Sequence, residues 1–131
     1  MLGLDTNVLV RFLVQDDAEQ FERARRLIKR EVAQNEPVLI SLFVLIETEW
    51  VLRSRYALPK SDIITVFSSL LDAVELTFED EPSIEEAVFL WKDSACEFAD
   101  CLLNARHRRL GCRATATFDS KAAKTPGFIP V

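Results

Sequence analysis

Four acidic residues have types and positions suited to metal chemistry, and none of them has a basic residue beside it as a partner: Asp5, Glu47, Asp100 and Asp119. Carboxylate oxygens are the hard ligands that Mg²⁺ prefers, with Mn²⁺ as a close substitute. A bound divalent ion lowers the pKa of an attacking water and neutralises charge that develops on a phosphodiester. The four acids therefore predict metal-assisted hydrolysis of a phosphodiester bond.

Simpler structural roles exist for some of these acids. Asp5 and Asp119 could cap the helices that follow them. Glu47 is harder to explain in this way, because every residue three or four positions from it is apolar and no base is in reach. Glu49, by contrast, precedes Arg53 by four residues, and we expect this pair on the surface.

A second acid stands close to Asp100. Glu97 lies three residues earlier, and like charges at that spacing repel, which a divalent cation would relieve. Whether Glu97 itself reaches a metal stays open. Asn104 follows Asp100 by one helical turn, and it could hydrogen-bond a carboxylate, orient a metal-bound water or face solvent.

The sequence lacks the motifs of several other classes of enzyme. The sequence has no GxxxxGK[ST] loop and no GxSxG turn, and a single histidine, His107, excludes an HExxH zinc site. An aspartyl-phosphate phosphatase would need a second carboxylate two residues after Asp5, where Asn7 stands. The three cysteines lack paired metal-ligand spacing, so we expect reduced, partly buried thiols.

Short apolar strands alternate with amphipathic helices along the chain. This alternation predicts an α/β fold with a mostly parallel sheet covered by helices on both faces, and sites in such sheets lie beyond the carboxyl ends of the strands. The expected strands are 2–4, 38–40, 74–78, 114–118 and an edge strand within 127–131; the expected helices are 6–13 with Thr6 as the cap, 17–34, 43–56, 61–72, 82–91 and 97–110.

Length and charge narrow the class of protein. The 131 residues fit one domain, 1–131, and no apolar run approaches the roughly 20 residues of a membrane helix. The N-terminus lacks the pattern of a secretory signal, so we expect a cytosolic protein. A net charge of −5 implies that any binding of nucleic acid relies on local basic clusters, of which there are two, at Arg23–Arg30 and Arg106–Arg109.

Four segments together resemble the PIN-domain ribonucleases, and among them the VapC-type toxins of bacterial toxin–antitoxin pairs. The segments are LDTNVLVRFLVQDD, SLFVLIETEWVLRSRY, EFADCLLNARHRRLGC and TATFDSKAAKTPGF, and they are spread from Leu4 to Phe128, so the resemblance extends along nearly the whole chain. Matched position by position, the metal-binding acids of this family fall on the same four residues that the pairing argument selects. Many relatives carry Asp where this chain has Glu97.

The resemblance implies a three-layer α/β/α fold with a five-stranded, mainly parallel sheet. It also implies Mg²⁺- or Mn²⁺-dependent hydrolysis of RNA, a homodimer and an inhibitory antitoxin partner. Small polar residues that orient the carboxylates match Thr6, Asn7 and Thr117, and Arg106, Arg108 and Arg109, one to two turns beyond Asp100, could contact the RNA backbone. Two alternatives stay open: a PIN-like binding module without turnover, and a metal-dependent nuclease that acts on DNA.

Overall fold

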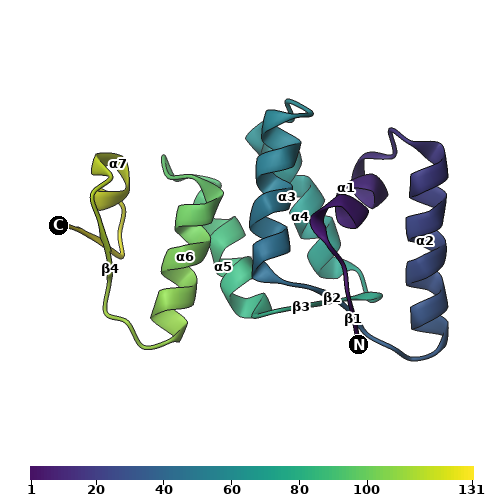
Figure 1. The fold of residues 1–131 in the computed structure, drawn as a ribbon. Helices are drawn as coiled ribbons and strands as arrows, with labels where there is room; N and C mark the ends of the chain where they lie inside the picture. The colour runs from purple at the N-terminus through teal and green to yellow at the C-terminus, as the bar shows by residue number, and fades with distance from the viewer. The chain divides into compact units, whose positions relative to one another are not determined.

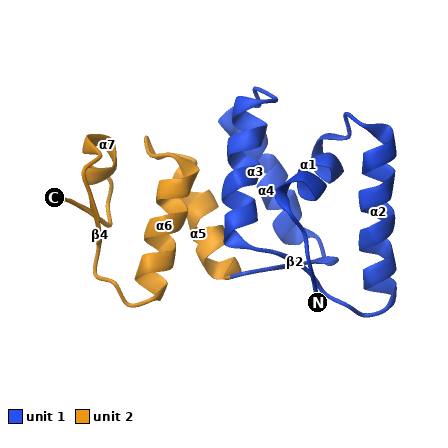
Figure 2. Cartoon of the chain, in the orientation of Figure 1, with its two compact units in different colours: residues 1–79 blue, residues 80–131 orange.

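The computed structural model describes all 131 residues, Met1 to Val131. Seven helices and five strands follow one another in the order β1, α1, α2, β2, α3, α4, β3, α5, α6, β4, α7, β5 (Figure 1). The chain divides into two compact units, residues 1–79 and residues 80–131 (Figure 2).

The first unit holds a three-stranded parallel sheet and four helices. Strand β1 (Leu2–Gly3) pairs with β2 (Val38–Ile40), which pairs on its other side with β3 (Leu76–Phe78). The strands are linked by α1 (Thr6–Val14) and α2 (Ala18–Ala33), and then by α3 (Leu42–Ser54) and α4 (Lys60–Asp72). Each parallel pairing thus has a helical connection between its strands, as parallel strands require.

Side-chain caps and a small apolar core fix the elements of the first unit. Asp17 and Ser41 accept hydrogen bonds from backbone amides in the first turns of α2 and α3, which satisfies donors that a helix start leaves free. Leu4, Ile28 and Val38 form a buried cluster that joins the end of β1 to α2 and β2. This cluster fixes the position at which the chain leaves β1 and enters α1.

The second unit packs two helices together and adds a two-stranded parallel sheet. Helices α5 (Glu81–Trp91) and α6 (Phe98–Arg109) contact each other, and the rings of Trp91 and Phe98 lie 5.2 Å apart at their junction. Strand β4 (Thr115–Thr117) pairs with β5 (Phe128–Pro130) across the short helix α7 (Ser120–Ala123). Gly111, at φ +94°, ends α6.

The predicted α/β class with parallel strands is confirmed, and all five predicted strands are present. They pair as a three-stranded and a two-stranded sheet. Strand β3 begins at Leu76 rather than at Val74, and most other boundaries differ from the predicted ones by one or two residues. Of the two caps considered for α1, Asp5 is the one that the structure shows, and Thr6 is the first residue of the helix. No helix combines the length and the apolar character that crossing a membrane requires.

Candidate active site

Two of the four predicted acids belong to the first unit. Asp5 lies just beyond β1 and caps α1, and its carboxylate accepts a hydrogen bond of 3.0 Å from the amide of Val8. The cap orients the carboxylate at the start of the helix and leaves the residue exposed. Glu47 lies in the middle of α3, is also exposed and forms no ion pair. Both carboxylates are therefore free of basic partners.

The burial of α3 differs from the sequence expectation. Glu49, expected on the surface, is 3% exposed and pairs with Arg53 at 2.9 Å. The apolar spacing of the helix predicts that Phe43, Ile46, Trp50 and Val51 face inward, but Phe43 and Trp50 are exposed. The buried residues of the helix are instead Leu45, Thr48, Glu49 and Leu52. Apolar residues occupy most of the circumference of α3, so periodicity alone did not identify the face that packs inward.

The other two acids belong to the second unit, where they form an acidic group with Glu97. Asp100 is in the first turn of α6, Glu97 is the residue before that helix, and Asp119 caps α7 through the amides of Lys121 and Ala122. Burial raises the pKa of Asp100, and the charges of Glu97 and Asp119 raise it further. None of the three carboxylates is ion-paired.

Two polar residues near these acids have defined partners. The hydroxyl of Thr117 accepts a hydrogen bond of 3.0 Å from the amide of Asp119, so it holds the backbone of that acid. Asn104 does not face solvent: it is 5% exposed, donates to the carbonyl of Pro126 at 3.3 Å and accepts from Arg108 at 3.3 Å. Thr6 is partly buried and Asn7 is exposed, both in the first turn of α1.

The three arginines proposed as RNA contacts all have carboxylate partners. Arg106 and Arg109 pair with Asp80, each at 2.8 Å, and Arg108 pairs with Glu86 at 2.7 Å. These pairs join α6 to α5 and its start, and they neutralise part of the positive charge that the sequence places there.

Asp80 is a buried carboxylate that sequence reasoning did not single out. Its burial acts to raise the pKa, but hydrogen bonds from Ser83 and Arg106 and the charge of Arg109 outweigh it, so the pKa of Asp80 lies below its usual range. The residue also caps α5 at φ 52°, and the spacing to Ser83 beside Pro82 was a signal for this cap. The ion pair between Asp80 and Arg106 of α6 could not be predicted from the sequence, because the two residues are 26 positions apart.

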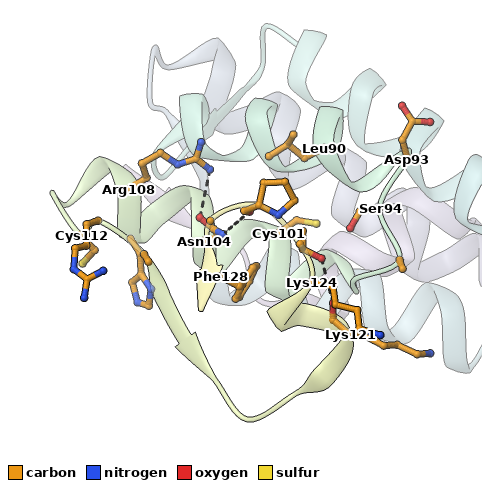
Figure 3. Close-up of a pocket in the computed structure, with 17 residues that line it drawn as sticks. Leu90, Asp93, Ser94, Cys101, Asn104, Arg108, Cys112, Lys121, Lys124 and Phe128 are labelled. Atoms are coloured by element: carbon orange, nitrogen blue, oxygen red, sulfur yellow. Dashed lines mark hydrogen bonds between the residues drawn. The ribbon is translucent and has the colours of Figure 1, made fainter. Parts of the chain in front are cut away.

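A cavity of about 710 Å³ lies within the second unit (Figure 3). Cys101 and Phe128 contribute apolar surface, Arg108, Lys121 and Lys124 border it, and the two hydrogen bonds of Asn104 cross one side. Asp100 and Asp119 are not among the residues that line it. The cavity is therefore distinct from the acidic group.

The structure brings Asp100, Asp119 and Glu97 into electrostatic contact, and it places Asp5 and Glu47 in the other unit. Neither unit by itself positions three or more His, Cys, Asp or Glu side chains to hold a metal ion. The donor set nevertheless fits a hard divalent ion, because the acids are unpaired and at least one of them resists ionisation.

Comparison with known proteins assigns the family. The PIN domain matches this chain over residues 3–127, which includes all four acids. The chain belongs to the PIN domain family. The VapC ribonuclease of Aquifex aeolicus (strain VF5) is 27% identical over 128 residues, which cover 98% of this chain and 93% of that protein. The predicted membership among VapC-type PIN domains is thus confirmed, and both likenesses support a nuclease.

Proposed function

We propose that this PIN domain, residues 1–131, is a divalent-metal-dependent endoribonuclease and the toxin of a toxin–antitoxin pair. The observation that carries the proposal is the unpaired acidic group of Asp100, Glu97 and Asp119 in a chain that resembles a VapC ribonuclease along nearly its full length. Crowded carboxylates without bases destabilise a protein that binds no cation, so such a group indicates a binding site for one.

Asp5, Glu47, Asp100 and Asp119 would hold one or two Mg²⁺ or Mn²⁺ ions. When bound, the metal supplies a water of lowered pKa and neutralises charge on the phosphate. Burial raises the pKa of Asp100, and the charges of Glu97 and Asp119 raise it further, a repulsion that a bound cation would relieve. Thr117 restrains the backbone of Asp119. The cap to Val8 orients Asp5, while Thr6, Asn7 and Asn104 remain proposed supports of the carboxylates.

The family resemblance extends the proposal to partners. We expect an inhibitory antitoxin as a partner and a homodimer of this chain. Size-exclusion chromatography with light scattering of the purified protein tests the dimer directly. A monomer at concentrations at which the protein is active would contradict it.

The test of the activity uses total bacterial RNA, because the target RNA need not be known in advance. The protein, freed of any bound inhibitor, is incubated with the RNA in Mg²⁺, and new 5′ ends are sequenced. We expect discrete cuts that disappear in chelator and in Asp100→Asn. Cuts in DNA substrates alone would indicate a DNA nuclease, and no cuts in either nucleic acid, with Mn²⁺ also tried, would indicate a binding module.

A further inference from the structure

A basic groove of about 590 Å³ runs between α1 and α2 within the first unit. It begins at the N-terminal end of α1, where the proposed metal ligand Asp5 lies. Four arginines from the two helices line it. We call this surface the arginine groove, and its polar lining comprises Asp5, Asn7, Arg11, Gln20, Arg23, Arg26 and Arg30.

Three of the arginines form a row along α2. Arg23, Arg26 and Arg30 are spaced by three and four residues, which places them on one face of the helix. The row rises by about 10.5 Å from first to last at 1.5 Å per residue. A line of positive charges of this kind suits an extended polyanion, which carries a phosphate at every nucleotide.

Two of the three arginines in this row have no carboxylate partner, and the third has only a long contact with one. Arg23 and Arg30 are exposed and form no ion pair, and Arg26, 75% exposed, is 3.7 Å from Glu22. Glu22 is already bound by Arg25 at 2.9 Å. The guanidinium groups of the row are therefore available to a ligand, unlike the paired arginines of α6.

Arg11 completes the basic lining from the side of α1. It is held in place by Asp16 at 2.9 Å and by the hydroxyl of Tyr56 at 3.2 Å. Its Nε atom is buried without an acceptor, so this guanidinium retains one unsatisfied donor. The structure thus fixes one arginine at the groove and leaves Arg23 and Arg30 of the row without an ion pair.

We propose that the arginine groove holds the phosphate backbone of the RNA segment that flanks the cleaved bond, an inference that rests on the proposed function. An RNA strand bound along the arginines of α2 would lie in the groove that Asp5 also lines. Local positive charge is needed because the whole protein carries a net charge of −5 and repels RNA. Phosphate contacts position a strand without reading its bases, so this groove would orient RNA of any sequence.

The test measures RNA binding separately from cleavage. Fluorescence anisotropy of a short, mixed-sequence, single-stranded RNA is followed in Mg²⁺ with the cleavage-impaired Asp119→Asn protein as the parent. Arg23→Gln/Arg30→Gln is compared with Lys29→Gln/Arg55→Gln, which removes the same charge from the same unit at exposed residues that form no ion pair and do not line the groove. Melting temperatures show that each variant is folded.

We expect the groove variant to bind roughly tenfold more weakly or worse, and its plot of log K against log salt to lose about 1.4 in slope, at 0.7 per phosphate contact. The control pair should change both quantities much less. If both pairs of substitutions weakened RNA binding equally while the wild-type protein still cut RNA, the proposed role of the groove would be wrong. The proposed nuclease activity would still stand.

Two other results would also overturn the inference. Unchanged RNA affinity together with lost binding of a glutamate-rich peptide would assign the groove to an acidic polypeptide partner. A wild-type protein that neither binds nor cuts RNA would overturn the proposed function, and the groove with it.

Discussion

The carboxylate of Asp80 is the clearest case of a single side chain that stabilises a unit of this protein. Its side chain is 5% exposed and contacts two arginines of α6, and it caps α5. Asp80→Asn keeps the cap and tolerates the left-handed backbone, but it removes the charge that both guanidinium groups need. We expect a loss of about 1–2 kcal/mol at pH 7, less than for a fully buried pair because both arginines are partly exposed.

The pH dependence of this effect has a defined sign. The pKa of Asp80 is lowered in the folded protein, so its contribution is present above the unfolded value and is lost as pH falls through the folded one. Urea unfolding should therefore show wild type and Asp80→Asn converging in strongly acidic buffer. A constant gap at all pH values would contradict an ionic role.

In contrast to the carboxylate of Asp80, the hydroxyl of Thr48 is buried without a hydrogen-bond partner. Thr48 is 0% exposed in α3, and its Oγ1 has no hydrogen bond. Thr48→Val removes a desolvated polar group while keeping the shape, so we expect a gain of about 1 kcal/mol in the free energy of unfolding. Thr65→Val is the control, since the Thr65 hydroxyl is exposed and donates to the carbonyl of Ser61. No gain over Thr65→Val would contradict the idea.

The sequence identified candidate acids more readily than it predicted which acidic side chains are buried. The local sequence around Asp5 and Asp119 predicted both a helix cap and a metal ligand, and the structure confirms the caps. The burial of Glu49 and the partners of Asp80 depend on how helices pack, which charge spacing within one helix does not encode.

At the scale of elements, a glycine sets the distance between α6 and the loop before β5. Gly127 has φ +93°, and a Cβ there would overlap the side-chain amide of Asn104, which is bound to the carbonyl of Pro126. Gly111 has nearly the same φ but open space around it. We expect Gly111→Ala to cost about 1–2 kcal/mol from backbone strain, and Gly127→Ala to cost more because it also displaces Asn104.

A double-variant cycle isolates the contact from the strain. In an Asn104→Ala background the overlap is gone, so the cost of Gly127→Ala, measured by chemical denaturation, should fall toward that of Gly111→Ala. Additive effects of the two substitutions would mean that Asn104 and Gly127 do not restrict each other.

The elements themselves were largely predictable. Runs such as Val38–Ile40 and caps such as Ser41 are local signals, and the structure places β2 and α3 at these residues. Pro130 at the end of β5 also agrees with the tolerance of sheet edges for proline. The orientation of α3 was not predictable, because a helix that is apolar on most sides can be buried on more than one of them.

For the molecule as a whole, the distribution of charge matters more than its sum. The chain has 21 acids and 16 bases, yet the arginine groove carries unpaired positive charge while Asp100, Glu97 and Asp119 form a region without bases. Sequence counting revealed the excess of acid. It did not identify the arginines of α6 as paired, because their partners Asp80 and Glu86 lie far away in the sequence and reach them only in the folded chain.

From this distribution and the proposed metal site we predict that the stability of the protein depends on divalent metal. In chelator, Asp100→Asn removes repulsion with Glu97 and Asp119, so its melting temperature should equal or exceed that of wild type. Because the folded pKa of Asp100 is raised, wild type should lose stability relative to Asp100→Asn as pH rises through that pKa. Mg²⁺ should then stabilise wild type, by RT ln(1 + [Mg²⁺]/Kd), more than the variant. A variant less stable than wild type in chelator would instead make Asp100 a structural hydrogen-bonding residue, and the acidic group would lose its value as a sign of a metal site.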